Sequence, residues 1–294
     1  MAAGRSGPGR TRLDVTSFVS RSKMPQFSDA EQMLQACLAI PDIEASVLTL
    51  NARGAERALE AGARHLVYVL SASAAHSRSN AGRDTDAALQ EFAEVAAMVK
   101  ALDPSRRPRV EAGIATAFGC TLEGTVPADR VCALASRLAE LGADEIMLAD
   151  TVGYAQPRQV LALFKQVRQD IGSLPLGGYF HDTRGLALAN VAAALEAGVR
   201  KFDAALGGLG RSPSAPGVSG NVATEDLVYL LESMGLPTGV DLQGLMALRG
   251  RLSQWLPGAS QYGAVARAGL PKNFCIDGMN NATPLFSTPD LHFN

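Results

Sequence analysis

The chain is short of cysteine, of net charge and of long apolar runs, and each shortage excludes a class of protein. Only 4 cysteines occur among 294 residues, widely spaced and without a Cys-x-x-Cys pair. This spacing argues against a disulfide framework and against cysteine-bound zinc, so we expect a reducing, cytoplasmic location. A formal net charge of -2 provides no basic field for nucleic acid. The apolar runs are far shorter than the ~20 residues of a transmembrane helix, so we expect no membrane partner.

What the chain has in abundance is apolar residues, 47% of the total, enough to build a large core. No Pro/Gly/Ser-rich linker divides residues 11–256, and we expect one domain there. Over 257–294 we expect a tail with a helix and irregular segments. The opening stretch 1–10, MAAGRSGPGR, lacks the apolar region of a secretory signal. We expect it to be disordered or a misassigned start, with a short transit-like leader as the alternative.

One pattern recurs three times, in ALEAGARHLVYVL (58–70), LAELGADEIMLAD (138–150) and ALEAGVRKFDAAL (194–206). In each, an Ala/Leu-rich helix ends at a glycine, the residue best suited to a left-handed helix end. The short apolar run that follows is typical of a strand buried on both faces. Together with similar runs elsewhere, this gives about seven strands that alternate with helices. We therefore predict an α/β fold with parallel strands, a TIM (β/α)8 barrel lacking its first strand. A doubly wound open sheet is the alternative.

Polar residues follow the expected strands at their carboxyl ends, where parallel α/β folds collect functional groups. They are Asp14, Thr16, Ser17, Asn51, Ser71, Ser73, Thr116, Asp150, Thr151, His181 and Asp182. Because such side chains also cap helices, capping is the competing interpretation, above all for Thr151 and Asp182. In GGYFHDT (177–183), alternation along a strand directs Tyr179 and His181 to the same side. Two imidazoles at this spacing would indicate half of a metal site, but one position is a tyrosine.

Five segments, in the same order along residues 11–256, resemble the hydroxymethylglutaryl-CoA lyase family of TIM-barrel metallolyases. They are TSFVSRSKMPQFSDAEQ, AFGCTLEG, LADTVG, FHDTRGLALAN and GVSGNVATEDLVYLLESMGLPTGVDL. The resemblance implies a homo-oligomeric carbon–carbon lyase of leucine degradation that acts on an acyl-CoA thioester. Its reaction would be retro-Claisen cleavage of a 3-hydroxy-3-methylglutaryl-CoA-type thioester to acetyl-CoA and acetoacetate. A divalent cation, Mg²⁺ or Mn²⁺, would hold the substrate's hydroxyl and carbonyl oxygens and favour loss of the hydroxyl proton.

The resemblance also implies roles for individual residues. The metal ligands would be His181 and Asn221, with Tyr179 at the position of another ligating histidine. An imidazole combined with hard oxygen donors suits Mg²⁺ or Mn²⁺. Catalytic positions are matched by Ser212, Glu225, Asp14 and Asp150, and substrate-binding positions by Asn51, Ser73 and Thr151. Asp14 stands where the family usually has glutamate, and His76 is either a surface histidine or a contact of the thioester arm.

Three departures from the family pattern predict a weakened site. The family's Asp-Arg-Asp-Gly-Leu-Gln signature has no counterpart in residues 1–10, which removes a metal-ligating Asp and an enolate-stabilising Arg. Tyr179 replaces a histidine, and a phenol that titrates near ~10 is a poor ligand at neutral pH. In GLGRSPSA, Ser212 stands in place of a cysteine, and its hydroxyl is a much weaker acid than a thiol. We therefore expect the divalent cation to bind weakly.

Other functions compete with the lyase. The three departures favour a catalytically silent homologue or a partner subunit. A related acyl-CoA lyase with an altered substrate is a further alternative, whereas GVSGNVATEDLVYLLE disfavours a condensing synthase. The missing strand also predicts two unpaired sheet edges, along Leu13–Phe18 and Lys201–Leu206.

Overall fold

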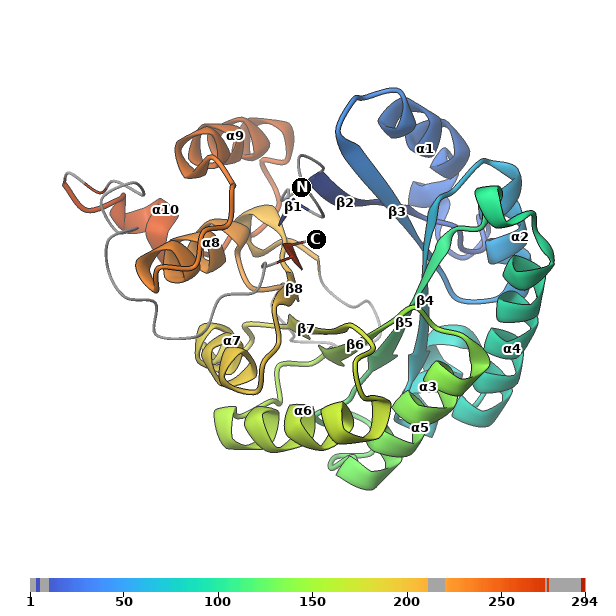
Figure 1. The fold of residues 1–294 in the computed structure, drawn as a ribbon. Coiled ribbons are helices and arrows are strands. Elements are labelled where there is room, and N and C mark those ends of the chain that lie inside the picture. Colours follow the sequence, from blue (N-terminus) through green and yellow to red (C-terminus); the bar gives the residue numbers. More distant parts are fainter. Residues whose placement is uncertain (1–3, 6–10, 211–219, 273, 275–291, 294) are drawn as a thin grey trace.

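Seven parallel strands form a curled sheet in this computed structural model, which describes residues 4–5, 11–210, 220–272, 274 and 292–293. The strands follow one another in sequence order, and the helices lie on the outside of the curl (Figure 1). A doubly wound sheet would instead reverse its strand order partway and carry helices on both faces. The TIM-barrel-like prediction is therefore confirmed, and the open-sheet alternative is wrong.

The elements have the following bounds. The strands are β1 (Gly4–Arg5), β2 (Thr11–Ser17), β3 (Ile43–Thr49), β4 (His65–Ser71), β5 (Arg109–Ala115), β6 (Glu145–Asp150), β7 (Leu176–Phe180), β8 (Lys201–Asp203) and β9 (His292–Phe293). The helices are α1 (Ala30–Leu38), α2 (Ala52–Glu60), α3 (Ala74–Ala81), α4 (Thr85–Ala101), α5 (Ala128–Leu141), α6 (Pro157–Ile171), α7 (Ala187–Glu196), α8 (Thr224–Ser233), α9 (Leu242–Trp255) and α10 (Ala264–Ala268). Short 3-10 turns are η1 (Pro25–Phe27), η2 (Pro104–Arg106) and η3 (Leu206–Gly208).

The repeated helix–glycine–strand units are present as the sequence predicts. Gly62, Gly142 and Gly198 have φ values of 81°, 106° and 88°, the left-handed region that side chains other than glycine rarely adopt. Strands β4, β6 and β8 each begin three residues after their glycine, at positions 65, 145 and 201. The glycines therefore fix where each helix ends and return the chain to the sheet.

The two edges of the curled sheet are partly covered. Strand β1 pairs antiparallel with the start of β2, with Gly4 opposite Arg12. Strand β9 pairs in parallel with β8, with Lys201 opposite His292. The predicted unpaired edge along Leu13–Phe18 is therefore present among the described residues, because β1 pairs only with Thr11 and Arg12. The prediction is wrong for the start of the Lys201–Leu206 edge, where β9 pairs with Lys201 and Phe202. Beyond Arg12, the outer edge of β2 has no partner within the described part of the chain.

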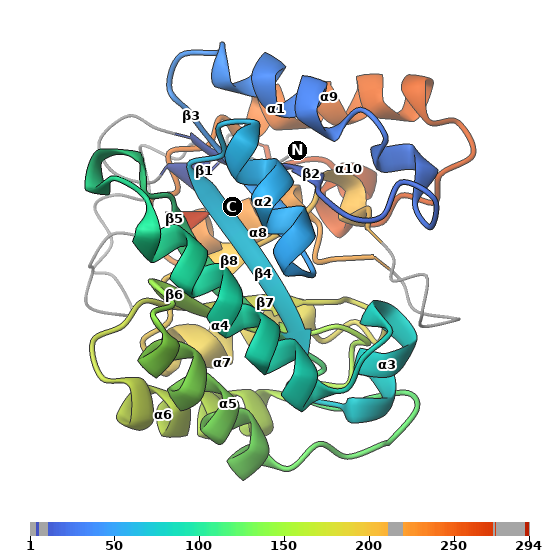
Figure 2. The same cartoon turned by 90° about the vertical axis from the view of Figure 1, so that its right-hand side faces the viewer.

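The outer layer holds the strands in place. Helices α2 and α4 pack together over β3 and β4 (Figure 2). On the next side, the rings of Phe118, Phe164 and Phe180 lie 5.9 to 6.4 Å apart between α6 and β7. These three rings are buried and hold the segment that leads into His181. Across the described ranges, no helix has the length and apolarity to span a bilayer.

Candidate functional site

The end of β7 brings together the three residues with predicted metal-binding roles. Tyr179 and His181 extend from the same side of the chain, and the Tyr179 hydroxyl lies 2.8 Å from His181 Nε2. Asn221 pairs with His181 through an isolated antiparallel bridge. Its buried Oδ1 accepts no hydrogen bond from the described residues. An imidazole, a phenol and an unsatisfied amide oxygen therefore meet at the carboxyl end of the barrel.

Three carboxylates act on this cluster. Burial raises the pKa of the Tyr179 phenol, and the negative charges of Asp203, Asp14 and Asp150 raise it further. Asp14 accepts a hydrogen bond from the Ser46 hydroxyl and is itself an exposed residue. Sequence reasoning missed Asp203, because it placed the end of that strand at Leu206. Since β8 ends at Asp203, the rule for polar residues at strand ends would have found it had the boundary been right.

A divalent cation fits this end of the barrel in part. His181 and Asn221 offer an imidazole and a buried oxygen without a hydrogen-bond donor, and the carboxylates of Asp14 and Asp203 lie close enough to act on Tyr179. The Tyr179 hydroxyl, however, occupies His181 Nε2, one of the two atoms through which an imidazole can bind metal. With its pKa raised, this phenol keeps its proton and is a poor ligand. The residues present therefore support weak binding.

Asp150 ends β6 and organises the loop that follows. Its Oδ1 accepts a hydrogen bond of 2.7 Å from the Tyr154 amide, and its Oδ2 one of 3.1 Å from the Ala155 amide. Burial raises the pKa of Asp150 to about 6, and the loop amides only partly oppose this shift. The Arg184 guanidinium lies 4.6 Å above the Tyr154 ring and fixes the far side of the loop. Asp150 thus combines loop positioning with a carboxyl group that titrates near neutrality.

Glu225 is fully buried at the start of α8 and ties three elements together. Its Oε2 accepts a hydrogen bond of 3.1 Å from the Gly207 amide in η3. Its Oε1 pairs with Arg249 of α9, which also donates to the Tyr262 carbonyl. Glu225 therefore holds the backbone from which the loop carrying Ser212 departs. Ser212 itself lies outside the described residues.

Two of the three predicted substrate-binding residues, Asn51 and Ser73, cap the helix that follows them, whereas Thr151 bonds to a neighbouring strand end instead of capping a helix. Asn51 Oδ1 accepts a hydrogen bond from the Gly54 amide (2.7 Å), and Ser73 Oγ accepts one from the His76 amide (3.0 Å). Thr151 Oγ1 accepts one from the Thr116 amide (2.8 Å). Each oxygen keeps a second lone pair. Their contact with substrate stays a prediction.

A chain of hydroxyl groups fixes His76, which is only 2% exposed, so the surface interpretation is wrong. Its Nδ1 lies 3.1 Å from Ser71 Oγ, which lies 2.8 Å from Thr116 Oγ1. The Thr116 hydroxyl also lies 2.7 Å from the Ala115 carbonyl; if its one proton goes there, Ser71 donates to Thr116 and accepts from His76. In that arrangement Nδ1 carries the proton. Nε2 is buried and makes no hydrogen bond among the described residues. Burial lowers the pKa of this imidazole.

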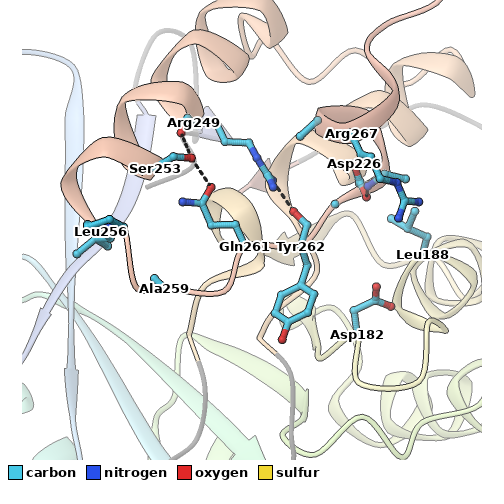
Figure 3. Close-up of a pocket in the computed structure, with 14 residues that line it drawn as sticks. Asp182, Leu188, Asp226, Arg249, Ser253, Leu256, Ala259, Gln261, Tyr262 and Arg267 are labelled. Atoms are coloured by element: carbon cyan, nitrogen blue, oxygen red, sulfur yellow. Dashed lines mark hydrogen bonds between the residues drawn. The ribbon is translucent and has the colours of Figure 1, made fainter.

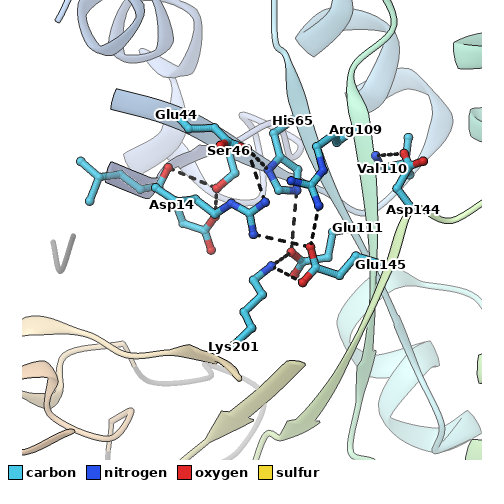
Figure 4. Close-up of polar contacts among 12 residues, drawn as sticks. Asp14, Glu44, Ser46, His65, Arg109, Val110, Glu111, Asp144, Glu145 and Lys201 are labelled. Atoms are coloured by element: carbon cyan, nitrogen blue, oxygen red, sulfur yellow. Dashed lines mark hydrogen bonds and ion pairs between the residues drawn. The ribbon is translucent and has the colours of Figure 1, made fainter. Parts of the chain in front are cut away.

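The opposite, amino end of the barrel holds a network of buried charges (Figure 4). Lys201 crosses the interior to pair with Glu111, and its Nζ lies 2.9 Å from Glu145 Oε1. Arg12 Nη1 lies 3.5 Å from Glu145 Oε2, and Arg12 Nη2 lies 3.4 Å from Glu44 Oε1. Although burial opposes charge on Lys201, the neighbouring carboxylates raise its pKa, so it stays protonated. These pairs connect β2 and β8, the outer two of the seven parallel strands, to β6.

Three members of this network, His65, Glu111 and Glu145, have ligand atoms within 4.8 Å of one another, close enough to hold a metal ion. The charges around these three residues disfavour metal binding. Lys201, Arg12 and the half-exposed Arg109 already face the carboxylates of Glu44, Glu111 and Glu145. An added dication would leave an excess of buried positive charge, which is strongly unfavourable. We therefore assign this group to closing the amino end of the barrel.

Comparison with known proteins agrees with this arrangement. The family model described as HMGL-like matches residues 19–251. The hydroxymethylglutaryl-CoA lyase of Pseudomonas mevalonii is 37% identical over 265 residues, which are 90% of this chain and 85% of that protein. The (R)-citramalyl-CoA lyase of Chloroflexus aurantiacus is 39% identical over 260 residues, 84% of this chain and 79% of that protein.

Solved structures lead to the same family. The HMG-CoA lyase of A. baumannii, solved in complex with coenzyme A and 3-methylmalate, matches with a TM-score of 0.85 and 38% identity. The match covers 93% of this chain and 86% of that one. The HMG-CoA lyase of Bacillus subtilis matches with a TM-score of 0.81 and 34% identity over 89% of this chain and 86% of that one. On the evidence of the curled parallel sheet, the cluster at its carboxyl end and these matches, the chain belongs to the HMGL-like family.

Proposed function

We propose that the chain is a carbon–carbon lyase that cleaves a CoA thioester of the 3-hydroxy-3-methylglutaryl type into acetyl-CoA and acetoacetate. The observation that carries the proposal is the meeting of His181, Asn221 and three carboxylates at the carboxyl end of the barrel. All four proteins named above are lyases of CoA thioesters, and the one from A. baumannii was solved with coenzyme A bound. The carboxyl end is also where TIM barrels carry their chemistry.

The reaction requires one proton to leave and one to arrive. The C3 hydroxyl loses its proton, the C2–C3 bond breaks, and C3 becomes the ketone carbon of acetoacetate. The electron pair of the broken bond passes to C2 and gives the acetyl-CoA enolate, which then takes up a proton. Mg²⁺ or Mn²⁺, weakly held by His181 and Asn221, would supply charge that favours loss of the hydroxyl proton.

The chain's own groups then have defined tasks. We assign Asp150 as the base that accepts the C3 hydroxyl proton, because it ends β6 beside the cluster and its pKa of about 6 allows exchange near neutral pH. Ser212 would return a proton to C2, slowly because a hydroxyl is a weak acid. Glu225 would support this step by holding the Gly207 backbone, five residues before Ser212. Asp14, Ser73 and Thr151 would line the acyl pocket, and Asn51 would contact the CoA arm of the substrate.

Three further properties belong to this proposal. A place in leucine degradation follows from the substrate type. A cytoplasmic location is supported by the three described cysteines, all of which are free thiols. Assembly into a homo-oligomer is supported by the outer edge of β2, which lacks a strand partner beyond Arg12 among the described residues. Light scattering on the purified chain would report the oligomeric state.

The activity is tested by incubating the chain with Mn²⁺ and either 3-hydroxy-3-methylglutaryl-CoA or citramalyl-CoA, and measuring acetyl-CoA released. We expect slow release that exceeds the release by Asn221→Ala. The citramalyl thioester belongs in the test because a citramalyl-CoA lyase is 39% identical to this chain. Release no faster than by Asn221→Ala from either thioester would overturn the proposal and favour the silent homologue.

A further inference from the structure

A cleft of about 550 Å³ opens where β2 ends and α2 begins. Its lining includes three arginines, two serines and an asparagine: Arg21, Arg53, Arg57, Ser20, Ser22 and Asn51. Among the residues that the structure describes, no acidic side chain lines it. For a chain whose net charge is -2, this is a local concentration of positive charge.

The charge of the cleft is only partly neutralised. Glu31, outside the lining, pairs with two of the arginines: Arg57 Nη2 lies 2.6 Å and Arg21 Nη2 2.8 Å from its carboxylate oxygens. Arg53 is exposed and makes no ion pair with any described residue. Three guanidinium groups thus face one carboxylate. Two positive charges remain for a ligand.

The arginine side chains of the cleft rest on a rigid base. Arg57 Nη1 donates to the Val19 carbonyl (3.3 Å), and its guanidinium lies 5.3 Å from the centre of the Phe18 ring. At Gly54 a Cβ would lie 2.3 Å from the Phe18 carbonyl oxygen, so α2 packs directly on the end of β2. Two of the first three amides of α2 are already used, because Asn51 accepts from Gly54 and Glu91 accepts from Ala52. Binding would therefore depend on the side chains rather than on the helix end.

A second cleft, of about 660 Å³, lies between α8, α9 and α10 (Figure 3). Arg249 and Arg267 line it, but so do Asp182 and Asp226. Arg249 is moreover paired with the buried carboxylate of Glu225. This cleft has no excess of positive charge and offers a polyanion no net attraction.

We infer that the cleft of Arg21, Arg53 and Arg57 binds the phosphate groups at the nucleotide end of a CoA thioester. The identity of the ligand rests on the proposed function, whereas the preference for phosphate rests on the arginines alone. Guanidinium groups match phosphate oxygens with paired hydrogen bonds, and the hydroxyls of Ser20 and Ser22 can add single ones. The cleft opens at the carboxyl ends of β2 and β3, on the side where the thioester would enter the barrel.

Calorimetric titration of the full chain with adenosine 3′,5′-bisphosphate and with inorganic phosphate tests the inference without any reaction. We expect Arg53→Gln to weaken the bisphosphate about tenfold, as loss of one charged contact does. Arg158→Gln is the matched control, since Arg158 is also exposed and is also the second residue of its helix. It should leave the affinity unchanged. Equal affinities for the wild type and Arg53→Gln, or no binding by the wild type, would overturn the inference. Equal binding of inorganic phosphate and the bisphosphate would show a general anion site and would overturn the nucleotide assignment.

A second measurement separates the cleft from the catalytic proposal. Arg53→Gln should raise KM for the CoA thioester relative to KM for the matching pantetheine thioester, which carries no phosphate at that end. A chain that binds the bisphosphate through Arg53 but cleaves neither thioester would keep the cleft and refute the activity. A chain that cleaves both, with the same KM ratio in wild type and Arg53→Gln, would keep the activity and refute the cleft.

Discussion

The two ends of the curled sheet treat buried polar groups in different ways. At the amino end, Lys201, Arg12 and their neighbours pair each buried charge with an opposite one. At the carboxyl end, the carboxylates of Asp203, Asp14 and Asp150 all act on the neutral Tyr179. Buried polar atoms without a hydrogen bond among the described residues occur at both ends: Asn221 Oδ1 and His76 Nε2 at one, Arg12 Nε and His65 Nε2 at the other. Both ends contain histidine and carboxylates, so residue type alone does not separate them. The balance of charge separates the two ends. Buried charges that are paired with opposite charges stabilise the fold, whereas groups without such a partner are available to bind a ligand.

The largest expected effect comes from unbalancing the amino end. Lys201→Met removes the cation nearest Glu111 and Glu145, whose side chains are 1% and 3% exposed. Leaving a buried charge without its partner typically lowers the free energy of unfolding by about 3–5 kcal/mol. Urea unfolding followed by circular dichroism would measure the loss. Adding Glu111→Gln to Lys201→Met should restore part of the lost stability. The two remaining cations, Arg12 and Arg109, then face two carboxylates, Glu44 and Glu145.

The same variant sharpens the comparison of the two ends. Without Lys201, the group of His65, Glu111 and Glu145 should gain affinity for Mn²⁺, seen as a melting temperature that rises with Mn²⁺. A loss of stability below about 1 kcal/mol with no response to Mn²⁺ would contradict the role given to Lys201, because that is the range of an exposed ion pair.

At the carboxyl end, the next largest effect is expected from Ser212→Cys. A thiol titrates near ~8.5 and can deliver a proton at neutral pH far more readily than a hydroxyl. If the loop held by Glu225 and Gly207 brings position 212 to the enolate, turnover should rise by about 10²-fold. Acetyl-CoA release per second measures the change, with Ser212→Ala as the control. Equal rates for all three proteins would place position 212 away from proton transfer.

A smaller effect is expected from Tyr179→His. The phenol that now holds His181 Nε2 at 2.8 Å would be replaced by a second imidazole with a free lone pair at pH 7. We expect Mn²⁺ to bind at least about tenfold more tightly by calorimetry, the gain of roughly one ligand worth 1.4 kcal/mol. Tyr179→Phe is the control, since it releases His181 without adding a ligand. Sub-micromolar binding by the wild type, or equal affinities of Tyr179→His and Tyr179→Phe, would contradict this account.

The difference between the two ends also explains what the sequence could predict. Parallel strands, glycine-ended helices and polar residues at the carboxyl ends follow from local patterns, and the structure has them. The amino-end network does not follow, because Lys201 and Glu111 are 90 positions apart and Arg12 and Glu145 are 133 apart. Such pairs arise only when the sheet curls. The pairing of β1 with β2 and of β9 with β8 also does not follow from the sequence. Each of these segments has only two residues, too few to show the alternation of a strand.

The smallest expected effect concerns His76, whose burial lowers its pKa below the ordinary value near ~6.5. In the unfolded chain this imidazole takes up a proton as the pH falls through ~6.5, whereas in the folded chain it stays neutral to lower pH. The unfolded state then binds more protons, so stability is lost as the pH drops. Between pH 7.5 and 5.5 the loss from one such group is at most about 1.4 kcal/mol.

His76→Phe should therefore be less stable than the wild type at pH 7.5, because Ser71 loses the Nδ1 proton donor, yet lose less stability on acidification. Urea unfolding at both pH values would show the two stability curves converging. Parallel curves would mean that His76 takes up its proton in the folded state as well. Its Nε2 would then be open to solvent or to a carboxylate, and the carboxyl end would hold one unsatisfied acceptor fewer than the structure shows.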